Sequence, residues 1–412
     1  MPTAPAALDL AFVRAQFPAF SEPWLQGQAF FENAGGSYCC RHSLDRLGEY
    51  YRRLKVQPYY RYAVSTEAGQ WMDAAYERLA EYLGVGADEI HFGPSTSQNS
   101  YVLAQALRRT LRPGDEIVVT DQDHEANSGA WRRLASEGAV IRVWHVDPVS
   151  GALDPAALDR LLNERTRAVA FTHCSNILGH INPVATITAK VRAAGALSIV
   201  DGVAYAPHGL PDVTALGADI YLFSLYKTFG PHQGVMVVRA PVLERLGNEG
   251  HYFNGALPRK RLVPAGPDHA QIAAARGVAE YFDALDAHHG GGEDRGRAQR
   301  VRDLLRRAER PMLAGLLDYL GSRPELRVLG PTSADQRAAT VSFTSSQRPP
   351  ADIAARLATQ GIMAAAGHFY AVRLLEAMRV DPALGVVRLS FVHYSSPDEM
   401  LTLMKALDTV LA

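Results

Sequence analysis

The stretch that decides the fold is DIYLFSLYKTFGPHQGVMVV, residues 219–238. An apolar run leads into Lys227, a segment with glycine and proline follows, and a second apolar run starts at Gly234. Short apolar runs bounded by glycine and proline are typical of buried strands. The sequence therefore predicts that this lysine lies just past the carboxyl end of a buried strand. A charged amine is costly to bury there unless it has a partner or a function.

Similar apolar runs recur upstream, and segments with helical spacing separate most of them. Seven strands are predicted, one within each of the segments 89–93, 116–121, 140–146, 166–176, 196–203, 218–227 and 234–239. Strands that alternate with helices form a mainly parallel sheet with helices on both faces. The predicted fold class is α/β.

The pattern changes after residue 285, where the composition turns polar and rich in glycine. A long helical stretch leads from there to short strands predicted at 326–330, 338–345, 361–367 and 386–394. This change predicts a smaller α+β domain after a connection near residues 285–298. We expect a large domain at residues 26–285 and a small domain at residues 286–412. An N-terminal segment, residues 1–25, is expected to pack with the small domain.

The composition excludes several classes of protein. The 412 residues include 42 basic and 43 acidic side chains, so there is no basic excess for nucleic acid or a membrane surface. Cys39, Cys40 and Cys174 are too few and too badly spaced for a disulfide framework or a metal site. No apolar run is long enough to span a bilayer, and the N-terminus has no targeting pattern. We expect a cytoplasmic protein whose partner is a small molecule or a second copy of the chain.

Four predicted strands are followed by reactive or anion-binding side chains. In open α/β sheets, ligands bind beyond the carboxyl ends of the strands. Thr96 and Ser97 open a helix whose free N–H groups suit a phosphate, although taken alone this segment is better explained by helix capping. His124 follows the second strand, Asp201 ends a buried strand, and Lys227 follows a later one. Taken singly, these three also fit a surface histidine, a salt bridge and a lysine that reaches to solvent.

Together, these groups match the requirements of pyridoxal 5′-phosphate (PLP). A lysine amine forms a Schiff base with the cofactor aldehyde, and a carboxylate keeps the pyridine nitrogen protonated. A helix start with free N–H groups anchors the phosphate. The order of Asp201 before Lys227, 26 residues apart, is the most informative part of the pattern.

At this point the chain resembles a known family, the class V aminotransferase and cysteine desulfurase group of fold-type I PLP-dependent enzymes. The segments that carry the resemblance are FFENAGGSY, DHEAN, THCSNILGHINPV, IVDGVAYAPHG, DIYLFSLYKTFGP, GIMAAAGHFYA and VVRLSFVHY. They cover nearly the whole chain. The resemblance implies a PLP-binding large domain with a seven-stranded, mainly parallel sheet, a small C-terminal domain, and a homodimer with sites at the subunit interface.

The resemblance also implies roles for single residues. Lys227 would be the Schiff-base lysine, Asp201 the partner of the pyridine nitrogen, and His124 the side chain stacked on the cofactor ring. Asn176 would lie near the phenolic oxygen, and Arg388 would bind the substrate α-carboxylate. The positions that would bind the phosphate are Thr96, Ser97, Ser224 and Tyr226, the last being histidine in many relatives.

One departure from the family pattern concerns sulfur chemistry. Tyr370 stands where cysteine desulfurases carry a nucleophilic cysteine, and no cysteine follows Cys174. A phenol cannot replace a thiolate in persulfide chemistry, because its pKa is higher and it cannot hold sulfane sulfur. We therefore expect the chain not to be a persulfide-forming desulfurase.

Two other departures affect cofactor contacts. Ala204 replaces a glutamine that touches the cofactor in relatives, and Pro267 lies in a stretch that in relatives reaches the phosphate of the neighbouring subunit. His269 and Asn254 are candidates to make that contact instead. The tyrosine-rich segment 57–63 either lines a side-chain pocket or packs in a dimer interface.

The expected function is that of a PLP-dependent enzyme acting at Cα or Cβ of an amino acid, with Lys227 and His124 as catalytic residues. Transamination and β-elimination, including C–S bond cleavage, both fit this description. Two alternatives stay open. One is an amino-acid epimerase of the isopenicillin-N-epimerase-like type, and the other is a non-catalytic binding or scaffold protein on the same fold.

Overall fold

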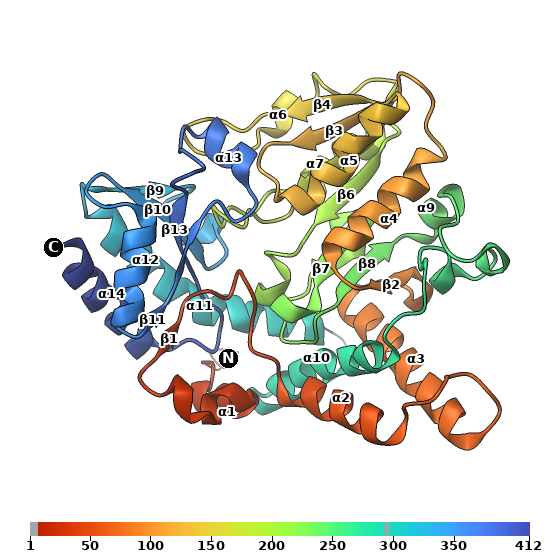
Figure 1. The fold of residues 1–412 in the computed structure, drawn as a ribbon, viewed down its shortest axis with the longest axis horizontal. Helices are drawn as coiled ribbons and strands as arrows, with labels where there is room; N and C mark the ends of the chain where they lie inside the picture. Colours follow the sequence, from red (N-terminus) through yellow and green to blue (C-terminus); the bar gives the residue numbers. More distant parts are fainter. Residues whose placement is uncertain (1–6, 293–295) are drawn as a thin grey trace, which may run out of the picture.

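A seven-stranded sheet forms the centre of the computed structural model, which describes residues 7–292 and 296–412 (Figure 1). The spatial order is β2 (Ile90–Gly93), β8 (Gly234–Val238), β7 (Ile220–Ser224), β6 (Leu197–Asp201), β5 (Thr166–Thr172), β3 (Glu116–Thr120) and β4 (Val140–Trp144). Only β8 runs antiparallel to its neighbours β2 and β7. The predicted α/β class with a mainly parallel sheet is confirmed.

Helices cover both faces of this sheet because alternate strand residues point to opposite sides. Val118 packs in a core with α3 (Ala63–Leu83), α7 (Val184–Ala193) and α10 (His269–His288). Its neighbour Ile117 packs in a second core with α4 (Thr96–Arg108), α5 (Gly129–Arg132) and α9 (Ala240–Arg245). The two apolar layers hold the sheet between the helices and so keep the ends of its strands in place.

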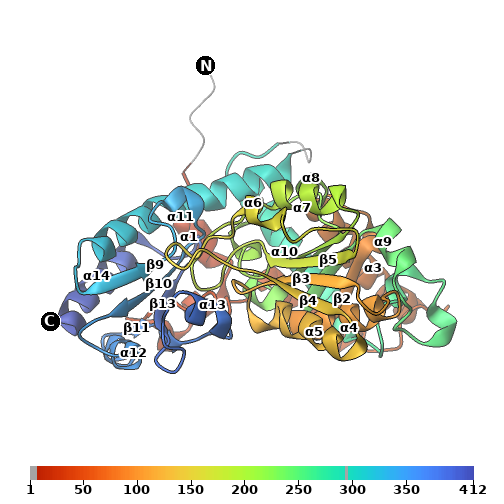
Figure 2. The same cartoon turned by 90° about the horizontal axis from the view of Figure 1, so that it is seen from above.

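A second, antiparallel sheet follows in the C-terminal part, in the order β12 (Ala365–Gly367), β13 (Val386–Ser390), β10 (Thr340–Ser345) and β9 (Leu326–Leu329). It has its own apolar core with α11 (Arg297–Gly321), α12 (Pro350–Thr359) and α14 (Pro397–Leu411). In Figure 2 this sheet and its helices lie beside the larger sheet. The remaining helices are α1 (Leu10–Ala15), α2 (Arg41–Arg53), α6 (Pro155–Leu158), α8 (Val213–Leu216) and α13 (Val372–Ala377).

The strand predicted at residues 361–367 is divided in two. Its first half is β11 (Ile362–Met363), which pairs in parallel with β1 (Ala29–Phe30), and its second half is β12. Arg14 from α1 is ion-paired with Glu399 of α14, while Asp9 contacts His288 of α10, and the packing of residues 1–25 with the small domain stays a prediction. The domain division at residues 25 and 285 stays a prediction, and residues 1–6 and 293–295 lie outside the described part of the chain.

No helix among the described residues is long and apolar enough to cross a bilayer. The described residues also contain no group of three or more His, Cys, Asp or Glu side chains arranged to hold a metal ion.

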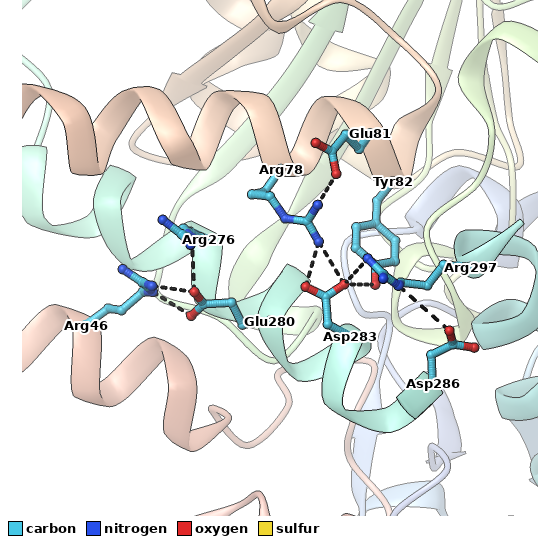
Figure 3. A network of polar contacts seen from close by, with 9 residues as sticks. All are labelled: Arg46, Arg78, Glu81, Tyr82, Arg276, Glu280, Asp283, Asp286 and Arg297. Carbon is cyan, nitrogen blue, oxygen red and sulfur yellow. Dashed lines mark hydrogen bonds and ion pairs between the residues drawn. The ribbon is translucent and has the colours of Figure 1, made fainter. Parts of the chain in front are cut away.

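A network of ion pairs joins helices on one face of the large sheet (Figure 3). At its centre, Asp283 of α10 accepts hydrogen bonds from Arg78 of α3 at 2.8 and 2.6 Å. It also accepts from the Tyr82 hydroxyl at 2.8 Å and from Arg297 of α11 at 3.0 Å. One carboxylate thus ties together three helices, two of which pack on the large sheet and one of which continues into the small domain.

We predict that Asp283→Asn destabilises the protein, because the amide loses the charge that three donors share. The expected loss is about 1–2 kcal/mol, and it appears as a lower thermal midpoint in calorimetry. Asp318→Asn, at an exposed position of α11, is the control and leaves the midpoint unchanged. Equal midpoints for both variants would show that the network contributes nothing to stability.

Candidate active site

The carboxyl ends of the parallel strands and the start of α4 enclose a cavity of about 210 Å³. Residues from five segments that are far apart in sequence line it, each at or just past the carboxyl end of a strand, as the strand-end pattern predicts. Eight of the predicted site residues are among them: Thr96, Ser97, His124, Asn176, Asp201, Ser224, Tyr226 and Lys227. Arg388 does not line the cavity itself, but it is close enough for its charge to act on Lys227 and His124.

Asp201 is the last residue of β6, and its side chain is 5% exposed. Burial raises the pKa of its carboxyl to about 6, while the backbone N–H of Val203 and the charge of Lys227 act against this rise. The N–H of Val203 donates to Oδ1 at 2.8 Å. A buried carboxylate held in this way is stabilised by a further cation, and the protonated nitrogen of a pyridine ring would be one.

Lys227 ends a short 3₁₀ turn, Leu225–Lys227, which directly follows β7. Burial, together with the positive charge of Arg388, lowers the pKa of its amine to about 8. The carboxylates of Asp201 and Glu32 act in the opposite direction. An appreciable fraction of the amine is therefore neutral near neutral pH, as a nucleophile or base must be.

His124 begins the short 3₁₀ turn Glu125–Asn127, and its Nδ1 accepts the backbone N–H of Ala126 at 3.0 Å. Burial lowers the pKa of the imidazole to about 3, and the charges of Lys227 and Arg388 contribute. The ring is therefore neutral, and because Nδ1 is an acceptor the proton lies on Nε2. A neutral flat ring at the cavity wall suits a stacking role.

The hydroxyls predicted to bind phosphate partly bind one another. Ser95 is the N-cap of α4, and its side chain accepts the N–H of Gln98 at 3.2 Å, so capping explains this serine. Thr96 donates its hydroxyl to the carbonyl of Phe223 at 2.8 Å, and the Ser224 hydroxyl lies 2.7 Å from Thr96 Oγ1. The Thr96 and Ser224 hydroxyls are thus already hydrogen-bonded, whereas the N–H groups that open α4 can donate to a phosphate without rearrangement.

His232 and Cys174 are among the cavity residues that were not identified from the sequence. His232 lines the cavity, and its ring stacks on that of Tyr226 with centroids 4.6 Å apart and an angle of 11°. It comes five residues after Lys227, so its place in the same glycine and proline motif was a usable signal. Cys174 also lines the cavity but follows β5 without any feature that distinguishes it from a core thiol.

Arg388 comes from β13 and links the small domain to the cavity. Its guanidinium is ion-paired with Glu32, lies 3.7 Å over the Phe369 ring, and donates to the carbonyl of Asn176 at 3.3 Å. The side chain is 3% exposed, and burial lowers its pKa while Glu32 opposes the change. Its Nε has no partner within the described chain, so the group can still donate to a carboxylate.

Asn176 provides a test of whether the cavity fits PLP. Its Nδ2 donates to the carbonyl of Phe369 at 3.0 Å, whereas its buried Oδ1 has no partner among the described residues. Buried polar atoms are almost always hydrogen-bonded. An unpaired oxygen beside a buried carboxylate and a buried amine indicates that a polar ligand completes this cavity, and PLP fits that description.

The segment around Tyr370 lies over the His124 loop. Phe369 and Tyr370 both have left-handed backbone angles, with φ of 46° and 60°. The carbonyl of Tyr370 accepts the N–H of Glu125 at 2.8 Å, and its ring centroid is 5.2 Å from that of His124. Strain of this kind in residues other than glycine is typical of functional segments. The side chain of Tyr370 is 66% exposed.

The residues proposed for the cross-subunit contact do not reach the cofactor cavity within one chain. Asn254, Pro267 and His269 line a separate cavity of about 670 Å³, together with Gln57 and Tyr59. Exposed Tyr59 and Phe253 line this cavity, and Tyr60, Tyr62 and Tyr252, which are near them in sequence, are exposed as well. The tyrosine-rich segment is therefore on the outer surface and away from the cofactor cavity.

Comparison with known proteins gives a consistent family assignment. The family model described as aminotransferase class-V matches residues 29–286 and 299–403. The aminotransferase-like protein FGM3 of Gibberella zeae is 37% identical, with 98% of this chain and 99% of that protein covered. A cysteine desulfurase of Serratia proteamaculans is 30% identical, with 97% of each chain covered. The solved apo structure of a cysteine desulfurase from Thermococcus onnurineus shares the fold, with a TM-score of 0.85, 23% identity and 99% of each chain covered.

We predict that Lys227 in the cofactor-free protein reacts with acetic anhydride with a pH midpoint of about 8. The reaction rises with pH because the neutral amine is the nucleophile. Arg388→Gln should move the midpoint to higher pH by removing a positive charge, and Asp201→Asn should move it lower by removing a negative one. Peptide mass spectrometry measures the labelling, with exposed Lys405 as the internal reference. A midpoint near the ordinary lysine value of 10.5 would contradict the assignment.

Proposed function

Because the chain belongs to the class V aminotransferase family of PLP-dependent enzymes, we propose that its 210 Å³ cavity is the PLP site and that it acts on a free α-amino acid. The observation that carries this proposal is the pairing of a lysine of lowered pKa with a buried carboxylate in one cavity. The reaction proposed is transamination or β-elimination, and C–S bond cleavage is one form of the latter.

PLP, when bound, withdraws electrons from the substrate Cα and so weakens the bonds to that atom. Asp201 would keep the pyridine nitrogen protonated, the neutral His124 ring would pack on the cofactor ring, and Asn176 would bond its phenolic oxygen. The groups that would hold the phosphate are the N–H groups that open α4 with Thr96, Ser97, Ser224 and Tyr226. We add His232 to this set, since its ring stacks on Tyr226 at the cavity wall.

Lys227 is the proposed residue for proton transfer at the substrate Cα. A base works best when its pKa is close to the working pH, because both protonation states are then accessible. The value of about 8 meets this condition. Arg388 is the proposed partner of the substrate carboxylate, a role that suits a planar guanidinium held in place by Phe369 and Glu32.

We also propose that the chain does not form a persulfide. Burial raises the pKa of Cys39 and Cys174 to about 12 and that of Cys40 to about 11, so none of the three thiols is an effective nucleophile. Tyr370, in the position of the expected thiol, carries a phenol. Cys174 is the thiol that tests this proposal most directly, because it lines the cavity.

A homodimer is proposed as the working form. The exposed aromatic side chains around the larger cavity form an apolar surface of the kind that buries itself against a partner. Asn254 and His269 lie on this surface, so a second copy of the chain would bring them towards its partner's phosphate site. This arrangement agrees with the dimer that the family resemblance implies.

We predict that Lys227→Ala yields protein in which borohydride fixes no cofactor and keto-acid release falls about 100-fold or more. Lys190→Ala is the matched control, because Lys190 is ion-paired on the surface of α7 with Asp159. It should keep the visible absorbance and the activity of the parent. A colourless parent protein that takes up no PLP would overturn the enzyme proposal and favour the scaffold alternative.

We predict that incubation with L-cysteine leaves no persulfide on the protein, as judged by intact mass spectrometry. Cys174→Ser should have unchanged turnover, since no sulfur passes through that thiol. In the same assays, keto-acid release without an amino acceptor identifies elimination, whereas strict dependence on an acceptor identifies transamination. A persulfide that disappears in Cys174→Ser would show that the chain is a desulfurase after all.

A further inference from the structure

A separate polar cavity of about 190 Å³ lies between α11, the turn that follows β6 and the start of β10. It is nearly as large as the cofactor cavity of about 210 Å³. Most of the side chains around it are charged or can be charged: His208, Asp303, Arg306, Arg307, Glu309, Arg310, Asp335 and Arg337. None of them belongs to the site described above.

Glu309 contributes a half-satisfied carboxylate to this cavity. Its side chain is 5% exposed, and its Oε2 lies 2.7 Å from Nδ1 of His208. Its Oε1 is buried and has no partner among residues 7–292 and 296–412. A carboxylate oxygen in this position needs a hydrogen-bond donor, preferably a cationic one.

Arginines surround the same space. Arg337 is 2% exposed and donates to the carbonyls of Leu329 and Thr340 at 3.0 and 3.2 Å, but its Nε has no partner in the described chain. Half-buried Arg306 makes no hydrogen bond or ion pair with any described residue, while Arg310 is ion-paired with Asp335. The cavity therefore offers free donors for an anion beside a free acceptor for a cation.

We propose that this cavity binds a free α-amino acid, with its ammonium group against Glu309 and its carboxylate against Arg306 and Arg337. A simple anion would be repelled by Glu309, and a simple cation would be repelled by the guanidinium groups. A zwitterion satisfies both sets of atoms at once. The inference depends on this cavity alone and not on the reaction proposed for the PLP site.

The position of the cavity connects it to the cofactor site. Arg306 and Arg337 both act electrostatically on Cys174, whose side chain lines the cofactor cavity. Burial lowers the pKa of neighbouring His173 to about 3, and the charge of Arg306 contributes to that shift. His208 lies on the turn that follows β6, the strand that ends at Asp201. A ligand that neutralises Arg306 would therefore change the field at the active site.

The test uses holoenzyme reduced with borohydride, so that the amino group of a ligand cannot react at Lys227. Glycine is the probe, titrated by calorimetry. We expect saturable binding that Glu309→Gln and Arg306→Gln each weaken by about tenfold or more, while Asp318→Asn, exposed on the same helix, changes nothing. Acetate and methylamine, which carry one charge each, should bind about tenfold more weakly than glycine.

Several results would overturn the proposal. One is the absence of saturable glycine binding, and another is equal glycine affinity in both variants and the parent. A third is acetate binding as tight as that of glycine, which would indicate a site for anions only. Loss of binding in Arg388→Ala would place the glycine in the active site instead. Circular dichroism checks that the variants are folded. Because Arg306 is only half-buried, its substitution should not prevent folding. The same titration on cofactor-free protein gives an answer even if no PLP binds.

Discussion

The constraint around which this structure is organised is the burial of two groups of opposite charge, Asp201 and Lys227, at the carboxyl edge of the large sheet. Each is largely removed from water, and burial shifts the pKa of each towards its neutral form. Their mutual attraction partly offsets this effect, but neither has a full set of partners within the described chain. Two apolar layers and the helices behind them hold these groups in place, so packing sustains an arrangement that is electrostatically unfavourable without a ligand.

The small domain supplies what the large sheet lacks. Arg388 reaches the site from β13, with Phe369 under its guanidinium and Glu32 from the N-terminal part as its counter-ion. Asn176 links the two domains, because it donates to the Phe369 carbonyl while its own carbonyl accepts from Arg388. In the proposed role of Arg388, the position of the small domain would determine where a substrate carboxylate lies. The proposed cofactor contacts and the proposed substrate contact come from different sheets of the protein.

Two cavities contain charged groups that lack a full set of partners among the described residues: Asp201 and Lys227 line one, and Arg306 and Glu309 line the other. Cys174 lines the first cavity and is influenced by arginines of the second. A chain with nearly equal numbers of acidic and basic residues can still have strong local electric fields. The position of each charged group, and not the composition, decides whether it has a partner of opposite charge. Elsewhere, as around Asp283, carboxylates and arginines neutralise one another and contribute to the packing of the helices.

The sequence by itself determined the α/β class, the strand positions, and the placing of Asp201, His124 and Lys227 at strand ends. It could do so because apolar runs and turn residues act locally, and the ends of parallel strands necessarily meet at one edge. Only the tertiary structure decided that Arg388 pairs with Glu32, which is 356 residues away, and that Thr96 and Ser224 bond one another. The stacking of His232 on Tyr226 and the unpaired Oε1 of Glu309 also appeared only in the tertiary structure. These features depend on which surfaces pack together, and no local pattern in the chain encodes that.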